Sequence, residues 1–201
     1  MKYFLKVILT SSILFITAAL AEPVQNEDID VKVTITGENV IVDLSMVVEA
    51  TPQQVWAVLT DFEHMANYIS NLKESRVIST SGFTQTIFQR GEASFGLMSF
   101  PFESTREMQL TPLNKIGSHM VSGSMRKMEG ETQLIEENGR IKIVLHSETI
   151  PGNWIPPLVG KQFIEHETRE QFQEIRNEIL KRKSLPSSVN TEQPARSNSS
   201  P

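Results

Sequence analysis

The segment that most constrains this chain is residues 46–75, where an apolar stretch leads into a clearly signalled short helix. Thr51 is a favourable N-cap, Pro52 occupies the first helical position, where its missing N–H costs nothing, and Gln54 completes a capping box. Apolar residues then recur at helical spacing and form one stripe, made of Val55, Val58, Leu59 and Phe62. The spacing predicts a strand that ends just before a short helix starting at Thr51.

A second short helix is expected directly after the first. Asp61 can end the first helix and cap the second, which would run through His64 and Met65. With strand candidates on both sides, this part of the chain has the order strand, short helix, short helix, strand.

The first 21 residues have the pattern of a secretory signal peptide. Lys2 and Lys6 form a positive n-region, residues 7–20 are largely apolar, and residues 19–21 form an A-x-A cleavage site. An uncleaved membrane anchor is the alternative, but the apolar stretch is shorter than the roughly 20 residues that a span needs. We therefore expect cleavage before Glu22 and export, to a bacterial periplasm in preference to secretion.

The remaining residues, about 180 in number, are enough for one domain with a sizeable core. Loss of Lys2 and Lys6 takes the net charge from −5 to about −7, which argues against a nucleic-acid partner. The chain has no cysteine and so no disulfide, and its stability must come from a hydrophobic core.

Alternating apolar and polar residues dominate the middle of the chain and predict an antiparallel meander. Residues 31–35 and 42–48 form a first hairpin, and Asn138-Gly139 is the clearest later turn signal. Further strands are expected at 74–80, 84–95, 100–110, 117–127, 131–137 and 140–149. In 100–110, one face is apolar and carries Phe100, Phe102, Met108 and Leu110.

A long helix is expected from about Leu158 to Lys183, after a proline-rich break. Its apolar stripe should lie on the sheet and consists of Ile164, Thr168, Phe172, Ile175 and Ile179. Residues 184–201 are rich in Ser, Pro and Asn with almost nothing apolar, and they are predicted to be a disordered tail.

The early motifs together resemble the SRPBCC superfamily, and within it the coenzyme-Q-binding, START-like and polyketide-cyclase-like group. They are Ala50-Thr51-Pro52, Val55-Trp56, Leu59-Thr60-Asp61-Phe62 and Tyr68-Ile69. The resemblance extends from about Val31 to Lys183. It implies an α+β helix-grip fold like that of Bet v 1: a curved antiparallel sheet, two short helices after the first hairpin, and one long C-terminal helix across the concave face. The chain would then divide into a signal peptide (1–21), a START-like ligand-binding domain (22–183) and a tail (184–201).

Members of this superfamily bind lipophilic molecules between the sheet and the long helix, and some use that cavity for cyclase or dehydrase chemistry. Relatives often carry a tryptophan two residues after the glycine that corresponds to Gly130, where this chain has Thr132. This departure changes the expected shape of the cavity.

The expected cavity lining comes from the inward faces of the strands and from the long helix. It consists of Leu44, Met46, Phe102, Arg106, Met108, Leu134, Ile143, Leu145, Trp154, Ile164, Thr168 and Phe172. The same side chains can instead fill a solid core, and the pattern alone leaves both interpretations open. Trp154 either packs the entry to the last helix or stands with Phe163 at the cavity mouth.

Arg106 is the unusual member of this set, because it falls on the apolar face of its strand. A charge in an apolar interior is costly unless it is paired. We expect either an acidic partner, plausibly on the last helix, or a ligand with an anionic or strongly polar head. The alternatives are a bend of the strand near Ser104, or a side chain that reaches the rim.

No catalytic or metal-binding motif is present in the sequence, because the histidines are scattered singly and no G-x-S-x-G occurs. We expect no catalytic residue, metal or cofactor. We favour a periplasmic binding or transport protein for a hydrophobic small molecule such as a lipid, quinone or polyketide-like compound, with transient contact with membranes. A cyclase or dehydrase-type enzyme, which needs a general acid or base in the cavity, and an interaction protein with a vestigial cavity are the alternatives.

Overall fold

The computed structural model describes residues 29–95, 98–152 and 157–185. They form one antiparallel sheet of eight strands in the order β1-β2-β8-β7-β6-β5-β4-β3. The strands are β1 (Asp30–Thr36), β2 (Asn39–Val48), β3 (Leu72–Ser81), β4 (Thr84–Phe95), β5 (Met98–Thr111), β6 (Lys115–Gly123), β7 (Met125–Glu137) and β8 (Arg140–Pro151). The helices are α1 (Pro52–Leu59), the 3₁₀ turn η1 (Met65–Asn67) and α2 (Pro157–Ser184).

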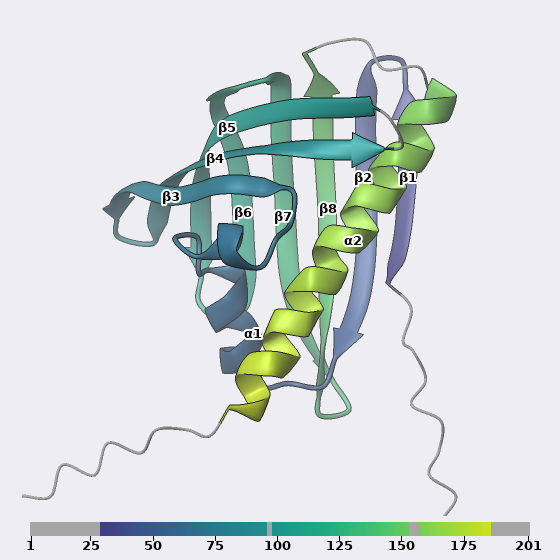
Figure 1. Ribbon diagram of the computed structural model, residues 1–201. Helices are drawn as coiled ribbons and strands as arrows, with labels where there is room; N and C mark the ends of the chain where they lie inside the picture. The colour runs from purple at the N-terminus through teal and green to yellow at the C-terminus, as the bar shows by residue number, and fades with distance from the viewer. Residues whose placement is uncertain (1–28, 96–97, 153–156, 186–201) are drawn as a thin grey trace, which may run out of the picture.

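The sheet curves around the long helix α2, which runs diagonally across it and packs against β1 and α1 (Figure 1). The predicted helix-grip fold is therefore confirmed. In the part of the chain that the structure describes, no helix is both long and apolar enough to cross a membrane. The signal-peptide prediction and most of the tail prediction concern residues outside the described ones.

The start of α1 is as predicted. Thr51 Oγ1 accepts a hydrogen bond from the Gln54 N–H at 3.2 Å, and Gln54 Oε1 accepts one from the Thr51 N–H at 2.9 Å. Val55, Val58 and Leu59 of its apolar stripe are buried. The capping box satisfies two backbone N–H groups at the start of α1.

The second short helix is smaller than expected: it is the single 3₁₀ turn η1, without a side-chain cap. Asp61 does not cap it, because its carboxylate instead binds the His64 ring at 2.6 Å and Arg182 at 2.8 Å. Its role is therefore to hold two side chains, one of them from α2.

The expected break between 127 and 131 is wrong. The turn lies at Ser124, next to Gly123 with φ +149°, and Gly130 is an interior position of β7 paired with Ser118 and Ser147. A Cβ at Gly123 would lie 2.3 Å from the Glu103 carbonyl oxygen, so this glycine permits a close approach of β5. Gly123 and Gly130 both lie near the expected break. The strand pairing shows that Gly123 is next to the turn and Gly130 is inside β7.

The deepest part of the core lies where the first hairpin and the last strand meet. Met46 of β2 pairs with Ile143 of β8, which pairs with Leu134 of β7. Ile179 of α2 has no exposed surface and belongs to the same cluster. The C-terminal half of α2 therefore covers this core. The remaining part of the inward face lies outside this cluster.

Candidate functional site

The predicted lining residues divide into two groups by their burial. Leu44, Met46, Met108, Leu134, Ile143 and Phe172 are buried, whereas Phe102, Arg106, Leu145, Ile164 and Thr168 are only partly buried. Trp154 lies outside the described residues. The register brings these positions onto one face, since Leu44 pairs with Leu145, and Leu145 pairs with Thr132.

The partly buried members are the informative ones. Leu145 is central in the sheet, between β2 and β7, and it faces the side that α2 covers. A leucine in that position would be fully buried if the interior were close-packed. Phe102 and Ile164 are likewise partly exposed, and the rings of Phe100 and Phe163 lie 5.1 Å apart between β5 and α2. Apolar side chains therefore retain accessible surface on the inward face.

Arg106 continues the inward face toward β4 and does not reach an acidic partner. It pairs with Ile87 of β4 and Met120 of β6, next to a register shift between Thr105 and Arg106. Its guanidinium donates to Gln89 Oε1. Among the described residues no carboxylate lies within ion-pair distance, so the expected partner on the last helix is absent from the described part of α2.

Gln89 connects Arg106 to the loop between α1 and η1. Its Nε2 donates to Ser75 Oγ at 3.0 Å, and Ser75 Oγ donates to the Phe62 carbonyl at 2.5 Å. Gln89 is 5% exposed and Ser75 is 7% exposed. A hydrogen-bonded chain of buried polar groups therefore fixes the Gln89 amide with its oxygen toward Arg106.

Three of the five buried side-chain polar atoms without a partner among the described residues lie on this inward face, and the other two belong to Asn39 and Asn71. Arg106 Nε, Ser118 Oγ and Gln85 Oε1 are buried, and none of them has a hydrogen-bond partner among the described residues. Gln85 and Ser118 are the two strand neighbours of Met108, which stands two residues after Arg106 on β5. Buried polar groups are normally hydrogen-bonded, so three such atoms on adjoining strands indicate a place for a polar group that is not part of the protein.

Burial lowers the pKa of Arg106 to about 10, and no neighbouring carboxylate offsets it. The guanidinium is still protonated at neutral pH. The inward face therefore presents a positive charge next to apolar side chains.

Candidates for general acid–base chemistry lie elsewhere. The side chains of His64, His119, His146 and His166 are between 48% and 65% exposed. His146 lies on the outer face, where a hydrogen bond to Asp43 raises its pKa. A buried histidine or a free pair of carboxylates would favour an enzyme. The described histidines are exposed, and the largely buried carboxylates Asp61 and Glu178 are both bound to Arg182.

The outer face carries a hollow of about 470 Å³, lined in part by Glu107, His119, Glu129, His146 and Glu148. It is the polar side of the sheet and is separate from the predicted lining.

On α2, His166, Glu167 and Glu170 bring ligand atoms within 4.8 Å of one another. Glu167 already accepts a hydrogen bond from Asn71 at 3.0 Å, and His166 lies 3.4 Å from Glu170. Such groups are common on solvated helices, and we assign no metal to them.

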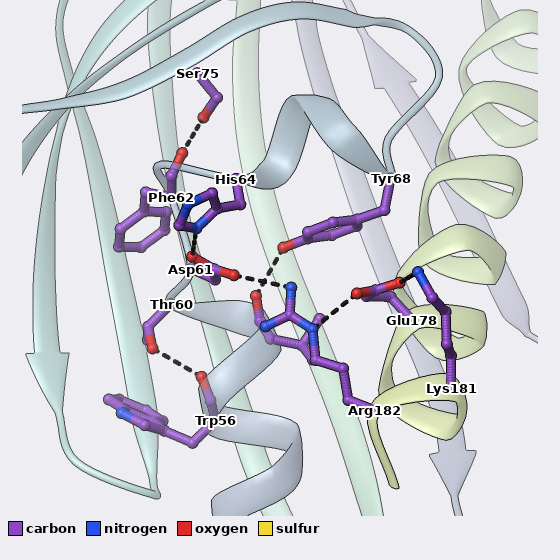
Figure 2. Close-up of polar contacts among 11 residues, drawn as sticks. Trp56, Thr60, Asp61, Phe62, His64, Tyr68, Ser75, Glu178, Lys181 and Arg182 are labelled. Carbon is purple, nitrogen blue, oxygen red and sulfur yellow. Dashed lines mark hydrogen bonds and ion pairs between the residues drawn. The ribbon is translucent and has the colours of Figure 1, made fainter. Parts of the chain in front are cut away.

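A cluster of polar contacts, here called the clamp, joins α2 to the α1–η1 loop (Figure 2). Arg182 binds Asp61 at 2.8 Å and Glu178 at 2.8 Å, and its guanidinium lies 5.5 Å from the centre of the Tyr68 ring. The Tyr68 hydroxyl donates to the Val58 carbonyl at 2.9 Å, and burial raises the pKa of Tyr68. The clamp holds the loop that also carries Phe62, the end of the polar chain from Arg106.

Burial alone would raise the pKa values of Asp61 and Glu178, but hydrogen bonds outweigh it in both. Those from His64 and Arg182 hold the pKa of Asp61 below 3.8, and those from Arg182 and Lys181 hold the pKa of Glu178 below 4.5. A carboxyl whose pKa is lowered by folding stabilises the folded state above its unfolded pKa. The contribution of the clamp is therefore complete above about pH 4.5 and is lost as the pH falls further.

We expect Arg182→Met to lower the free energy of unfolding at pH 7 by about 2 kcal/mol, because it leaves two largely buried carboxylates without their shared donor. Urea denaturation at pH 7 and at pH 3 measures this, and the difference from the unaltered protein should shrink at pH 3. Lys181→Met is the matched control, because Lys181 also binds Glu178 but is 69% exposed, and it should cost under about 1 kcal/mol. An equal loss from both substitutions would show that the clamp is only a surface ion pair.

The sequence predictions missed Gln85, Gln89 and Ser118, because serine and glutamine usually face solvent. A signal was available in the alternation, since Gln85, Ile87 and Gln89 share the face of Phe102, Arg106 and Met108 once β4 and β5 are paired.

A family model described as polyketide cyclase / dehydrase and lipid transport matches residues 48–176. No curated protein is significantly similar to this chain in sequence.

Several solved structures share the fold. The Zhui aromatase/cyclase from Streptomyces sp. R1128 superposes with a TM-score of 0.63 at 15% identity, covering 75% of this chain and 99% of that one. The STAR-related lipid transfer protein from Xanthomonas axonopodis gives a TM-score of 0.58 at 9% identity, covering 77% and 99%. A START superfamily protein from Mycobacterium smegmatis gives 0.59 at 10% identity, covering 70% and 97%. Identities this low establish the fold and not the ligand.

Proposed function

The chain belongs to the polyketide cyclase / dehydrase and lipid transport family, and from that premise we propose that it binds and carries a hydrophobic small molecule between the sheet and α2. One observation carries the proposal: Leu145 keeps accessible surface although it is central in the sheet and faces α2. Unfilled space beside apolar side chains is what a ligand pocket requires.

Binding is favoured over catalysis because the described histidines are exposed and the described inward face supplies no general acid or base beside Arg106. Cyclase or dehydrase chemistry would need such a group within hydrogen-bond reach of the substrate. The aromatase/cyclase and the lipid transfer protein both share the fold at low identity, so the fold alone does not decide between catalysis and carriage.

We further propose that the protein acts after export, as the positive n-region, apolar stretch and A-x-A site of residues 1–21 suggest. A quinone, a fatty acid or another lipid of an envelope membrane would then be within its reach. The absence of cysteine is consistent with a fold that relies on its core.

We expect protein expressed with its leader and purified without detergent from the periplasm to retain an apolar molecule. Native mass spectrometry followed by organic extraction measures the bound mass. The same spectrum shows whether residues 1–21 have been removed. Repeated recovery of ligand-free protein that also fails to bind fatty acids and quinones would contradict the binding proposal.

Leu145→Phe is the variant that tests the location. If the space beside Leu145 is open, the larger ring fills it, and bound ligand falls with little change in stability. If the interior is solid, overpacking costs about 1–3 kcal/mol and leaves binding elsewhere intact. Val144→Phe is the matched control, because Val144 immediately precedes Leu145 in β8 and faces the opposite side of the sheet.

A further inference from the structure

The unpartnered polar atoms of the inward face form one compact patch. Gln85, Met108 and Ser118 lie side by side on β4, β5 and β6, and Arg106 is the next inward residue of β5. Diagonal neighbours on one face of a sheet are roughly 7–8 Å apart, within reach of an arginine side chain. The register therefore places Ser118 one diagonal step from Arg106 on the β6 side, whereas Gln89, which binds the guanidinium, lies on the β4 side.

The charge of this patch is not balanced within the described chain. Arg106 carries the positive charge, and its described hydrogen-bond partner, Gln89 Oε1, is neutral. The Gln89 amide is held by Ser75 and so cannot turn away. Arg106 is partly buried, and its Nε is enclosed without a partner. Withdrawing a charge from water without pairing it costs free energy, and an entering anion offsets that cost.

The donors fit an anionic oxygen group better than a neutral one. Guanidinium hydrogen bonds to carboxylate and phosphate oxygens are charge-assisted and directional. The Ser118 hydroxyl can add a further donor. Next to the patch, the face continues into the partly exposed apolar side chains of Leu110 and Leu145.

Resting on the proposed function, we propose that the ligand is an amphiphile whose anionic oxygen head, a carboxylate or a phosphate, is bound by Arg106 Nε and the Ser118 hydroxyl, with its apolar chain over Leu145. The head would satisfy two of the buried atoms at once. The lone charge on the apolar face is then a specificity determinant for the head group.

The test compares ligands with the same chain and different heads. Dodecanoate, dodecyl phosphate and the neutral methyl dodecanoate are titrated into delipidated full-length mature protein by calorimetry. We expect at least one anion to bind about tenfold or more tightly than the ester, a difference of about 1.4 kcal/mol. The stronger of the two anions identifies the head as a carboxylate or a phosphate.

In Arg106→Met the preference for the anion should fall to near unity, while the ester binds as before. Arg90→Met is the matched control: Arg90 lies on β4, is 58% exposed and binds Glu74, so the same substitution there should leave the preference unchanged. Ser118→Ala should reduce the preference by a smaller factor, about threefold to tenfold. The Ser118→Ala variant still tests the head-group assignment if the Arg106→Met variant does not fold.

The outcomes separate the two proposals. Binding of the ester and the anions with equal affinity to the unaltered protein, or a preference that survives Arg106→Met, overturns the head-group assignment and leaves the binding function standing. If the unaltered protein binds none of the three ligands, the proposed function itself fails.

Discussion

A chain that ends at Gln171 should not fold. The truncation removes Phe172, Ile175 and Ile179, which are 7%, 5% and 0% exposed. Burying each such side chain stabilises a protein by about 1.5–3 kcal/mol, so their loss is comparable to the 5–15 kcal/mol that holds a whole domain together. We expect no cooperative transition in circular dichroism melts of this truncated protein.

The matched control is a chain that ends at Leu185. It keeps all of α2, including the hydrogen bond from Lys183 Nζ to the Glu49 carbonyl at 2.6 Å. Its melting temperature should equal that of the full chain, as the composition of the tail predicts. A cooperative melt of the chain ending at Gln171 would show that the sheet and α1 hold a core without the helix.

Gly91→Ala should strongly destabilise the sheet. A Cβ at Gly91 would lie 2.0 Å from the Asn71 carbonyl oxygen and 2.7 Å from Phe102 Cζ. The Asn71 carbonyl cannot withdraw freely, since it accepts the Glu92 N–H at 2.9 Å. We expect a loss of about 3 kcal/mol in urea denaturation, the upper range for overpacking.

Gly117→Ala is the control, because the added Cβ there would meet Gln109 Cβ at an ordinary 3.6 Å. Gly117, like Gly91, lies in a strand. Because both substitutions replace glycine with alanine, they make the same change in the unfolded chain. Gly117→Ala should change the free energy of unfolding by no more than about 0.5 kcal/mol. Equal effects of the two would mean that the Asn71 backbone yields, and the close approach would then have no energetic importance.

Much of the fold was predictable because local signals and the global arrangement agree. Asn138 and Gly139 have φ values of 53° and 75°, as the two-residue hairpin signal requires. Thr51 and Gln54 form both predicted capping hydrogen bonds. The turn at Ser124 was missed because a tight connection leaves little trace in the alternation of apolar and polar residues.

The site was predictable only in part. Arg106 could be singled out by its place on an apolar face, whereas Gln89 and Ser118 required the pairing of three strands. The expectation of an acidic partner on the last helix failed because the described acidic side chains of α2 bind other groups: Glu167 binds Asn71, and Glu178 binds Arg182. Which carboxylates turn inward depends on the rotation of the helix about its axis.

The pairing of β2 with β8 has a consequence for the order of events during synthesis. Met46 meets Ile143 only after almost a hundred further residues have been made, and α2 is made last of all. Contacts this distant in sequence slow folding. The apolar face of the first hairpin therefore lacks its native partners until β8 and α2 have been made. A chain of this topology therefore completes its core only when its last helix has been made.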